Sequence, residues 1–255
     1  MRAVLALLLV LALPRPAAAA EEVVLGLSQD QVSISTSFDG SEILIFGAVK
    51  RETPIPEGPP LEVVVTVEGP DRPVTVRRKE RRFGIWVNVE SVEVDSAPSF
   101  YAVATSGPWE EVISHTEDLR HAISVPRAIR SVGAPSGVVD SQAFTDAVIR
   151  IRRDRGLYIR KEGAVDLRES TLFDTAIALP ADLTEGMYTA RVFLTRDRSV
   201  VATYDAVIPV RKVGLERWLF VMSRQQPLLY GLMSLAIAIA AGWGASAVFR
   251  LLKPQ

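Results

Sequence analysis

The chain has 255 residues, of which 29 are basic and 30 acidic, and it contains no cysteine. This near-neutral balance argues against a protein that binds polyanions over its whole surface. The absence of cysteine excludes disulfides, thiol catalysis, haem attachment, iron–sulfur clusters and cysteine-ligated zinc.

Residues 1–20 are typical of a secretory signal peptide. One positive charge at Arg2 precedes an apolar run from Ala3 to Leu13, and Ala18 and Ala20 occupy the small-residue positions of a cleavage site. Eleven apolar residues are too few to span a bilayer as a helix. We therefore expect cleavage before Glu21, which would leave 27 basic and 30 acidic residues and a formal charge of −3. The alternative is an uncleaved N-terminal anchor.

Residues 21–106 contain seven short runs rich in valine, isoleucine and aromatic residues, separated by glycine, proline and aspartate turns. Val32 and Ile34 alternate with Ser33 and Ser35, which indicates one buried and one solvated face. The pattern predicts a mainly β fold, an immunoglobulin-like antiparallel β-sandwich. An exported part of roughly 190 residues is long enough to be held by burial alone.

A basic run interrupts this region. Residues 76–88, VRRKERRFGIWVN, place five cations in six consecutive positions and then turn to Phe, Ile and Trp. The simpler interpretation is a solvated hairpin in which Phe83, Ile85 and Val87 return to the core. The alternative is a binding site for an acidic protein surface, for anionic lipid headgroups or for a small anion. The candidate residues are Arg77, Arg78, Lys79, Arg81, Arg82 and Trp86.

Residues 107–160 change to a helical pattern. A first helix is predicted over 108–123, with Glu110 and Glu111 in its first turn, and a better supported one over 140–158. The second carries Arg150, Arg152 and Arg153, which with Arg155 could extend the basic surface. Strand patterns return over 161–211, with a hairpin turn at 196–199. This order leaves open a sandwich with a helical insertion or a second small α+β lobe.

Residues 212–226 form an amphipathic juxtamembrane segment, predicted to lie on the membrane surface or to continue into the span. Residues 227–249 carry no charge, and 23 residues at 1.5 Å each give roughly 34 Å of helix, enough to cross a bilayer. Small side chains recur every four positions on two faces of this helix and predict close helix packing, although an ordinary alanine-rich span would look similar. These residues are Ala236, Ala240 and Gly244 on one face and Ala238 and Gly242 on the other.

The segments LSQDQVSISTSFDGSEILIFGAV, VVVTVEGP, VRRKERRFGIWVN and PSFYAVATS cover much of residues 27–106. They resemble a family of transmembrane proteins from alphaproteobacteria. The resemblance implies an exported domain with a membrane anchor and no established activity. It also implies an accessory role beside sulfite exporter-like membrane proteins.

No catalytic signature stands out in the sequence. His115 and His121 are six residues apart, which on a helix places them about 240° apart and unable to share one ion. There is no phosphate-binding glycine loop, nucleophile elbow or calcium loop. We expect no enzyme, no metal and no cofactor.

These observations predict a single-pass protein of the inner membrane with its main domain in the periplasm and residues 250–255 in the cytoplasm. The expected function is an accessory module that docks an integral-membrane partner, and the alternative is an oxyanion-sensing or solute-binding domain that uses the arginines. Nucleic acid is not an expected ligand, because an exported domain rarely meets it. The oligomeric state stays open.

Overall fold

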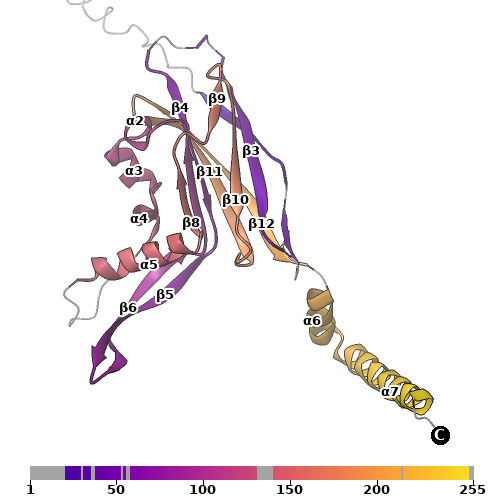
Figure 1. Ribbon diagram of the computed structural model, residues 1–255. Helices are drawn as coiled ribbons and strands as arrows, with labels where there is room; N and C mark the ends of the chain where they lie inside the picture. The colour runs from indigo at the N-terminus through magenta and orange to yellow at the C-terminus, as the bar shows by residue number, and fades with distance from the viewer. Residues whose placement is uncertain are drawn as a thin grey trace, which may run out of the picture.

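The computed structural model describes residues 21–29, 31–35, 38–52, 54–55, 58–130, 140–213 and 215–252. The expected signal peptide and the last three residues of the expected cytoplasmic tail lie outside these ranges. The described chain forms two β-sheets, a separate hairpin, a group of helices on one side and two C-terminal helices (Figure 1).

The smaller sheet, sheet A, has four antiparallel strands. Their alternating sequences bury one face only: in β3, Ile43 and Ile45 are buried while Leu44 and Phe46 are exposed. In spatial order the strands are β1 (Glu22–Leu27), β3 (Ser41–Lys50), β10 (Leu172–Leu179) and β9 (Asp166–Arg168).

The larger sheet, sheet B, has six strands, with a parallel pair at each edge and antiparallel pairs between. The predicted turn at 196–199 is confirmed, since Arg196 pairs with Ser199 across a two-residue loop. In spatial order the strands are β2 (Val32–Ile34), β12 (Ser199–Lys212), β11 (Gly186–Arg196), β4 (Leu61–Glu68), β7 (Tyr101–Thr105) and β8 (Tyr158–Lys161).

Sheet B is buried on both faces at β4 and β7, whereas β12 keeps one side exposed, including Val201 and Val207. Val63 and Val65 of β4 belong to the core shared with sheet A, whereas Val64 belongs to a second core under the helices. A strand covered on both sides needs apolar residues at every position, which explains the uninterrupted VVV of β4. The molecule is thus layered as sheet A, sheet B and helices.

The helices lie in the chain between β7 and β8. The helix predicted over 108–123 is instead divided among three short helices, α2 (Trp109–Val112), α3 (His115–His121) and α4 (Val125–Ala128). Ile113 is extended and buried, and Ser114 caps α3 by accepting a hydrogen bond from the Glu117 amide. The local capping chemistry therefore divides what the apolar spacing suggested was one helix.

The second predicted helix is present as α5 (Gln142–Asp154), but Tyr158 begins strand β8 rather than ending the helix. The buried face of α5 carries Phe144, Val148 and Ile149, while Ile151 is exposed.

Two helices follow β12. α6 (Leu215–Gln225) and α7 (Pro227–Leu252) are separate and adjoin at Gln226. Residues Pro227–Ser246 have a mean hydropathy of 1.7, and none of that window is buried against the rest of the molecule. Among the described residues, α7 is the helix long and apolar enough to cross a membrane.

The predicted mainly β class with a C-terminal apolar helix is confirmed. The immunoglobulin-like classification stays a prediction. Strands from before and after the helices share both sheets: β10 lies between β3 and β9, and β11 lies between β12 and β4.

Candidate functional site: a basic hairpin with an aromatic tip

The basic run lies on a long two-stranded hairpin formed by β5 (Asp71–Arg82) and β6 (Ile85–Pro98). It extends away from the sandwich beyond the helices (Figure 1). At about 3.3 Å per residue, a strand of 12 residues is roughly 40 Å long. The five cations follow one another along its distal half.

The proximal half of the hairpin is part of the second core. Val92 and Val94 are buried there, and Val74 and Val76 opposite them are partly buried among the same residues as Val148 of α5. The hairpin is therefore braced against α5 at its base, and only its outer half is free of the sandwich.

A group of hydrogen bonds, with no ion pair among them, stabilises this base. The Arg152 guanidinium of α5 donates hydrogen bonds to the Pro98 carbonyl and, at 2.6 Å, to the Tyr158 hydroxyl, which itself donates to Pro98 at 2.8 Å. Burial is the main cause that raises the pKa of Tyr158 to about 12, so the hydroxyl stays protonated and able to donate.

The distal half has two chemically different faces. Because side chains alternate along a strand, Arg77, Lys79 and Arg81 share one face, and Arg78 and Arg82 lie on the other. The register shifts between Arg78 and Lys79, where β6 has one more residue than β5. Arg81 faces Trp86 and Lys79 faces Asn88 across the strands.

On the face that carries Arg78 and Arg82, carboxylates neutralise the cations. Arg78 forms an ion pair with Glu90 at 2.8 Å and stacks on the Phe144 ring at 5.0 Å, and Arg82 lies 3.4 Å from Glu80. This face is turned toward α5, and Arg78 contributes to the bracing of the hairpin.

The opposite face of the distal half carries only cations on β5. Arg77, Lys79 and Arg81 are exposed and form no ion pair within the described residues. Trp86 lies among them with 69% of its surface exposed. Hereafter these four residues, Arg77, Lys79, Arg81 and Trp86, are called the cationic face.

An aromatic residue stands at the turn of the hairpin. Phe83 and Gly84 connect the strands with φ values of 49° and 83°, and positive φ at both positions is required by a type I′ turn. Phe83 is fully exposed and Ile85 is 64% exposed. The expectation that Phe83 and Ile85 return to the core is wrong, because the hairpin continues well past the edge of the sandwich.

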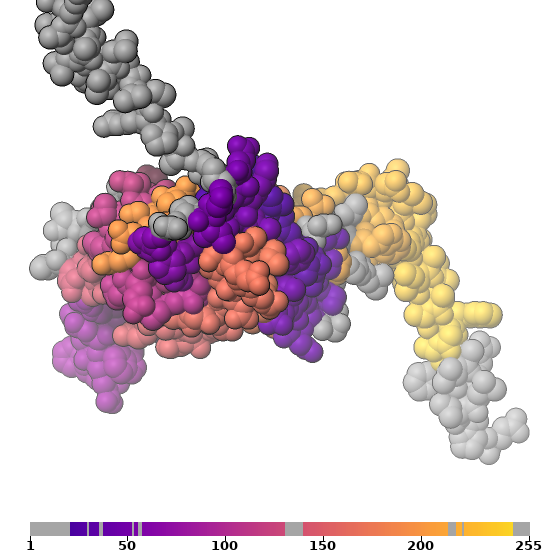
Figure 2. Space-filling view, turned by 90° about the horizontal axis from the view of Figure 1, so that it is seen from above, coloured from indigo at the N-terminus to yellow at the C-terminus, as the bar shows by residue number. Residues whose placement is uncertain are grey.

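The hairpin and the anchor leave sheet B at the same end. Glu68, after which the chain enters the hairpin, pairs with Thr189, and Val210, shortly before α6, pairs with Gly186. Gly186 and Thr189 both lie at the start of β11, so both exits are at one end of the sheet. Figure 1 shows the hairpin tip, α6 and α7 all projecting from this end, and Figure 2, seen from above, shows the hairpin and the C-terminal helices on opposite sides of the domain.

α6 has the surface expected of a helix at a membrane boundary. Trp218 and Phe220 are 51% and 61% exposed, and Arg224 stacks on the Phe220 ring at 5.4 Å. Along α7, the small residues predicted to permit close helix packing are all exposed: Ala236, Ala238, Ala240, Gly242 and Gly244.

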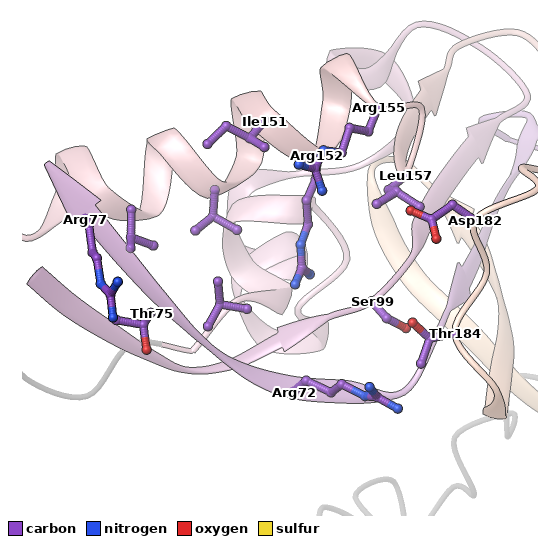
Figure 3. A pocket seen from close by; sticks show the side chains of 13 residues that line it. Arg72, Thr75, Arg77, Ser99, Ile151, Arg152, Arg155, Leu157, Asp182 and Thr184 are labelled. Carbon is purple, nitrogen blue, oxygen red and sulfur yellow. The ribbon is translucent and has the colours of Figure 1, made fainter. Parts of the chain in front are cut away.

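A cavity of about 380 Å³ lies between the base of the hairpin and α5 (Figure 3). Of the five predicted cations, Arg77 contributes to its wall, together with Arg72, Arg152 and Arg155. Figure 3 shows the Arg152 side chain reaching into the cavity. Its guanidinium donates hydrogen bonds to the Pro98 carbonyl and the Tyr158 hydroxyl. The walls also carry the Asp182 carboxylate and apolar side chains, including Val74, Val148 and Leu157.

A buried polar network connects the hairpin's attachment point to α3. Arg191 of β11 donates to the Tyr101 hydroxyl at 3.0 Å and to the carbonyls of His121 and Ala122, and it lies 3.6 Å from Glu68. Burial raises the pKa of Glu68 despite the Arg191 charge, and burial likewise raises the pKa of Tyr101.

Within the described residues, no group of three or more acidic or histidine side chains could hold a metal ion. His121 is half-buried, edge-on to Phe193 and 3.4 Å from Glu117, which makes it part of the packing of α3.

A family model described as "Putative transmembrane protein (Alph_Pro_TM)" matches residues 22–251. The match includes both sheets, the hairpin, α6 and nearly all of α7. The chain belongs to this family. Among the described residues α7 is the candidate span, and the protein is associated with the membrane. No curated protein matches the chain.

Proposed function

We propose that this protein is a periplasmic accessory module, anchored in the inner membrane, that docks an integral-membrane partner. The observation that carries the proposal is α7: an apolar helix whose small-residue positions are all exposed. In lipid, helices associate through close packing rather than through the hydrophobic effect, and small side chains permit that approach. No catalytic role is proposed for the domain.

The resemblance implies a sulfite exporter-like transporter as the partner, and this is the partner we propose. A transporter embedded in the same membrane would meet α7 within the bilayer and the domain outside it. Such a partner needs no enzymatic chemistry from the docked module, only a fixed position beside the transport path.

The test is co-purification in mild detergent at native expression. Ala240→Leu and Gly242→Leu, one on each small-residue face, should weaken association by about tenfold or more while leaving membrane insertion intact. Ile239→Leu is the matched control, since it keeps the volume of a large side chain on the same helix. Wild-type chain that purifies alone, or both variants associating as wild type does, would contradict the proposal.

A second candidate is an oxyanion-binding domain, favoured by the cavity bordered by Arg72, Arg77, Arg152 and Arg155. Isothermal titration with sulfite, sulfate and phosphate should then give saturable heat that disappears in Arg77→Ala/Arg155→Ala. Arg81→Ala/Arg82→Ala changes the charge equally but lies outside the wall of this cavity, so it should retain the heat. Equal loss in both variants would indicate nonspecific charge effects instead of a site.

A further inference from the structure

The position of the hairpin decides what it can meet. Both the hairpin and the chain leading to α7 leave the end of sheet B marked by Gly186 and Thr189 of β11. If α7 crosses the bilayer, that end of the domain is the one nearest the membrane surface. From Arg77 to the turn, the hairpin extends by about six residues, roughly 20 Å.

The charge of the hairpin is directed rather than spread evenly. In its distal half, Glu80 and Glu90 neutralise Arg82 and Arg78 on the face toward α5, and the cationic face forms no ion pair within the described residues. Glu93, opposite Thr75 nearer the base, is the acidic residue next to the cationic face. An excess of positive charge on one face matches a surface that is uniformly negative, such as the headgroups of an anionic leaflet.

The apolar residues of the tip match the same surface. Phe83, Ile85 and Trp86 are exposed at the end of the hairpin, where they stabilise no described packing. Aromatic side chains are enriched at the boundary between headgroups and acyl chains, because one part of the residue is apolar and the surroundings are wet. The exposed Trp218 and Phe220 of α6 follow the same logic next to the span.

The backbone conformation of the turn does not explain why residue 83 is phenylalanine, so the explanation must lie in its side chain. Asn-Gly is the pair that a type I′ turn favours, because asparagine tolerates positive φ, whereas phenylalanine at φ 49° is conformationally disfavoured. A disfavoured and fully exposed aromatic residue contributes nothing to the fold of the hairpin.

We propose that the β5–β6 hairpin is a second membrane contact, in which the cationic face binds anionic phospholipid headgroups and Phe83, Ile85 and Trp86 enter the interface. The inference rests on the proposed membrane anchorage by α7 but needs no protein partner. Span, α6 and hairpin would together hold the domain in one orientation relative to the bilayer. A lipid surface is favoured over an acidic protein because cations and exposed apolar residues gather at the end that faces the anchor.

The absence of cysteine makes a site-specific fluorescent probe straightforward. The full chain carrying Asn88→Cys, an exposed and uncharged position opposite Lys79, is labelled with an environment-sensitive dye. It is placed in nanodiscs of phosphatidylcholine alone or of equal parts phosphatidylcholine and phosphatidylglycerol. We expect a blue shift, and quenching by brominated lipid, in the anionic discs only, with reversal at high salt. Asp166→Cys on β9, an exposed site at the other end of the molecule, should show neither (Figure 1).

Two variants, made in the Asn88→Cys background, separate the contributions of charge and apolar surface. Arg77→Gln/Lys79→Gln/Arg81→Gln should abolish the shift, whereas Lys161→Gln/Arg168→Gln/Arg198→Gln, with the same change in net charge away from the hairpin, should preserve it. Phe83→Asn suits the turn better and so should fold at least as well as wild type, yet it should reduce quenching by the brominated lipid several-fold.

The proposal is overturned if the probe behaves identically in both kinds of disc, or if the control triple variant removes the shift as fully as the hairpin variant does. It is also overturned if a shift appears only after a partner protein is added. Because these discs contain no partner, failure here leaves the proposed docking through α7 intact, and failure of co-purification leaves the lipid contact intact.

Discussion

At the residue scale, a few buried or half-buried arginines stabilise the domain by donating hydrogen bonds to backbone carbonyls. Arg191 satisfies the carbonyls of His121 and Ala122 at the end of α3, where Ala122 adopts a left-handed conformation. Helix ends leave carbonyls without intrahelical partners, and a guanidinium can satisfy several at once. Glu68 beside it supplies a partial counter-charge at 3.6 Å, at the point where the chain turns toward the hairpin.

Glu68 gives the stability of the domain a specific pH dependence. Its pKa is raised by burial, so the folded state holds this proton to higher pH than the unfolded chain does. The stabilisation from Glu68 is therefore complete below the unfolded pKa, near 4.5, and is lost as pH rises through the folded pKa.

Glu68→Gln removes this titration. Chemical unfolding of the full chain in detergent, monitored by tryptophan fluorescence, should show the variant gaining stability relative to wild type as pH rises from about 4.5 toward neutrality. Glu52→Gln, at an exposed position after β3, is the control. A stability difference that is constant with pH, or that moves in the opposite direction, would contradict the assignment.

At the element scale, the hairpin depends on its attachment to α5. Arg152 reaches from the helix to the Pro98 carbonyl at the end of β6, and Tyr158 closes the same contact from β8. Removing the charged donor from such a part-buried group costs about 1–3 kcal/mol.

Arg152→Met keeps the apolar stem of the side chain and deletes the donor. We expect a loss of about 1–3 kcal/mol of stability and faster hydrogen exchange of the amides in residues 71–76 and 92–98. Exchange in β3 and β10 should change little, because these strands lie in the other sheet. Arg153→Met, at an exposed position next to it, is the control and should leave exchange unchanged.

An element is predictable from the sequence when its burial shows in its own residues, and it is not when its environment depends on residues distant in the sequence. The alternation of β3 and the continuous apolar run of β4 record burial directly, so both strands were predictable. The hairpin was not, because Val74 and Val76 alternate as in any core strand, and nothing after them marks the edge of the sandwich. The two faces of the basic run also depend on Glu90, which lies across the hairpin and 12 residues away.

The packing role of the small residues of α7 stays a prediction, for a different reason. Their spacing is visible in the sequence, but their role depends on a second helix that the chain does not supply within its described residues. The five exposed positions are consistent with that role without testing it.

At the scale of the whole molecule, the layers leave one end for the membrane. β4 and β12 both run antiparallel to β11 and so point the same way, which brings the hairpin and α6 out together. Sheet A covers one face of sheet B and the helices cover β4 and β7 on the other, whereas β12 keeps Val201 and Val207 exposed. The hairpin tip with Phe83 and Trp86, and α6 with Trp218 and Phe220, therefore project from the same end of the domain.

The orientation of α7 is the prediction on which the rest depends. The positive-inside rule favours the side with more cations as cytoplasmic, and four precede the span, Arg211, Lys212, Arg217 and Arg224, whereas two follow it, Arg250 and Lys253. A domain already crossing behind a signal peptide is largely indifferent to flanking charge, and cations near α6 have their own reason to meet anionic lipid.

We therefore expect the domain outside and residue 255 in the cytoplasm. Alkaline phosphatase fused after Gln255 is active only outside the cytoplasm, so this fusion should be inactive, whereas green fluorescent protein at the same position should fluoresce. A fusion after Lys212, before the span, is the matched control and should be active as phosphatase. Strong phosphatase activity at residue 255 would place the hairpin's cations in the cytoplasm, and nucleic acid would then become a ligand to consider, because the outside location is what argues against it.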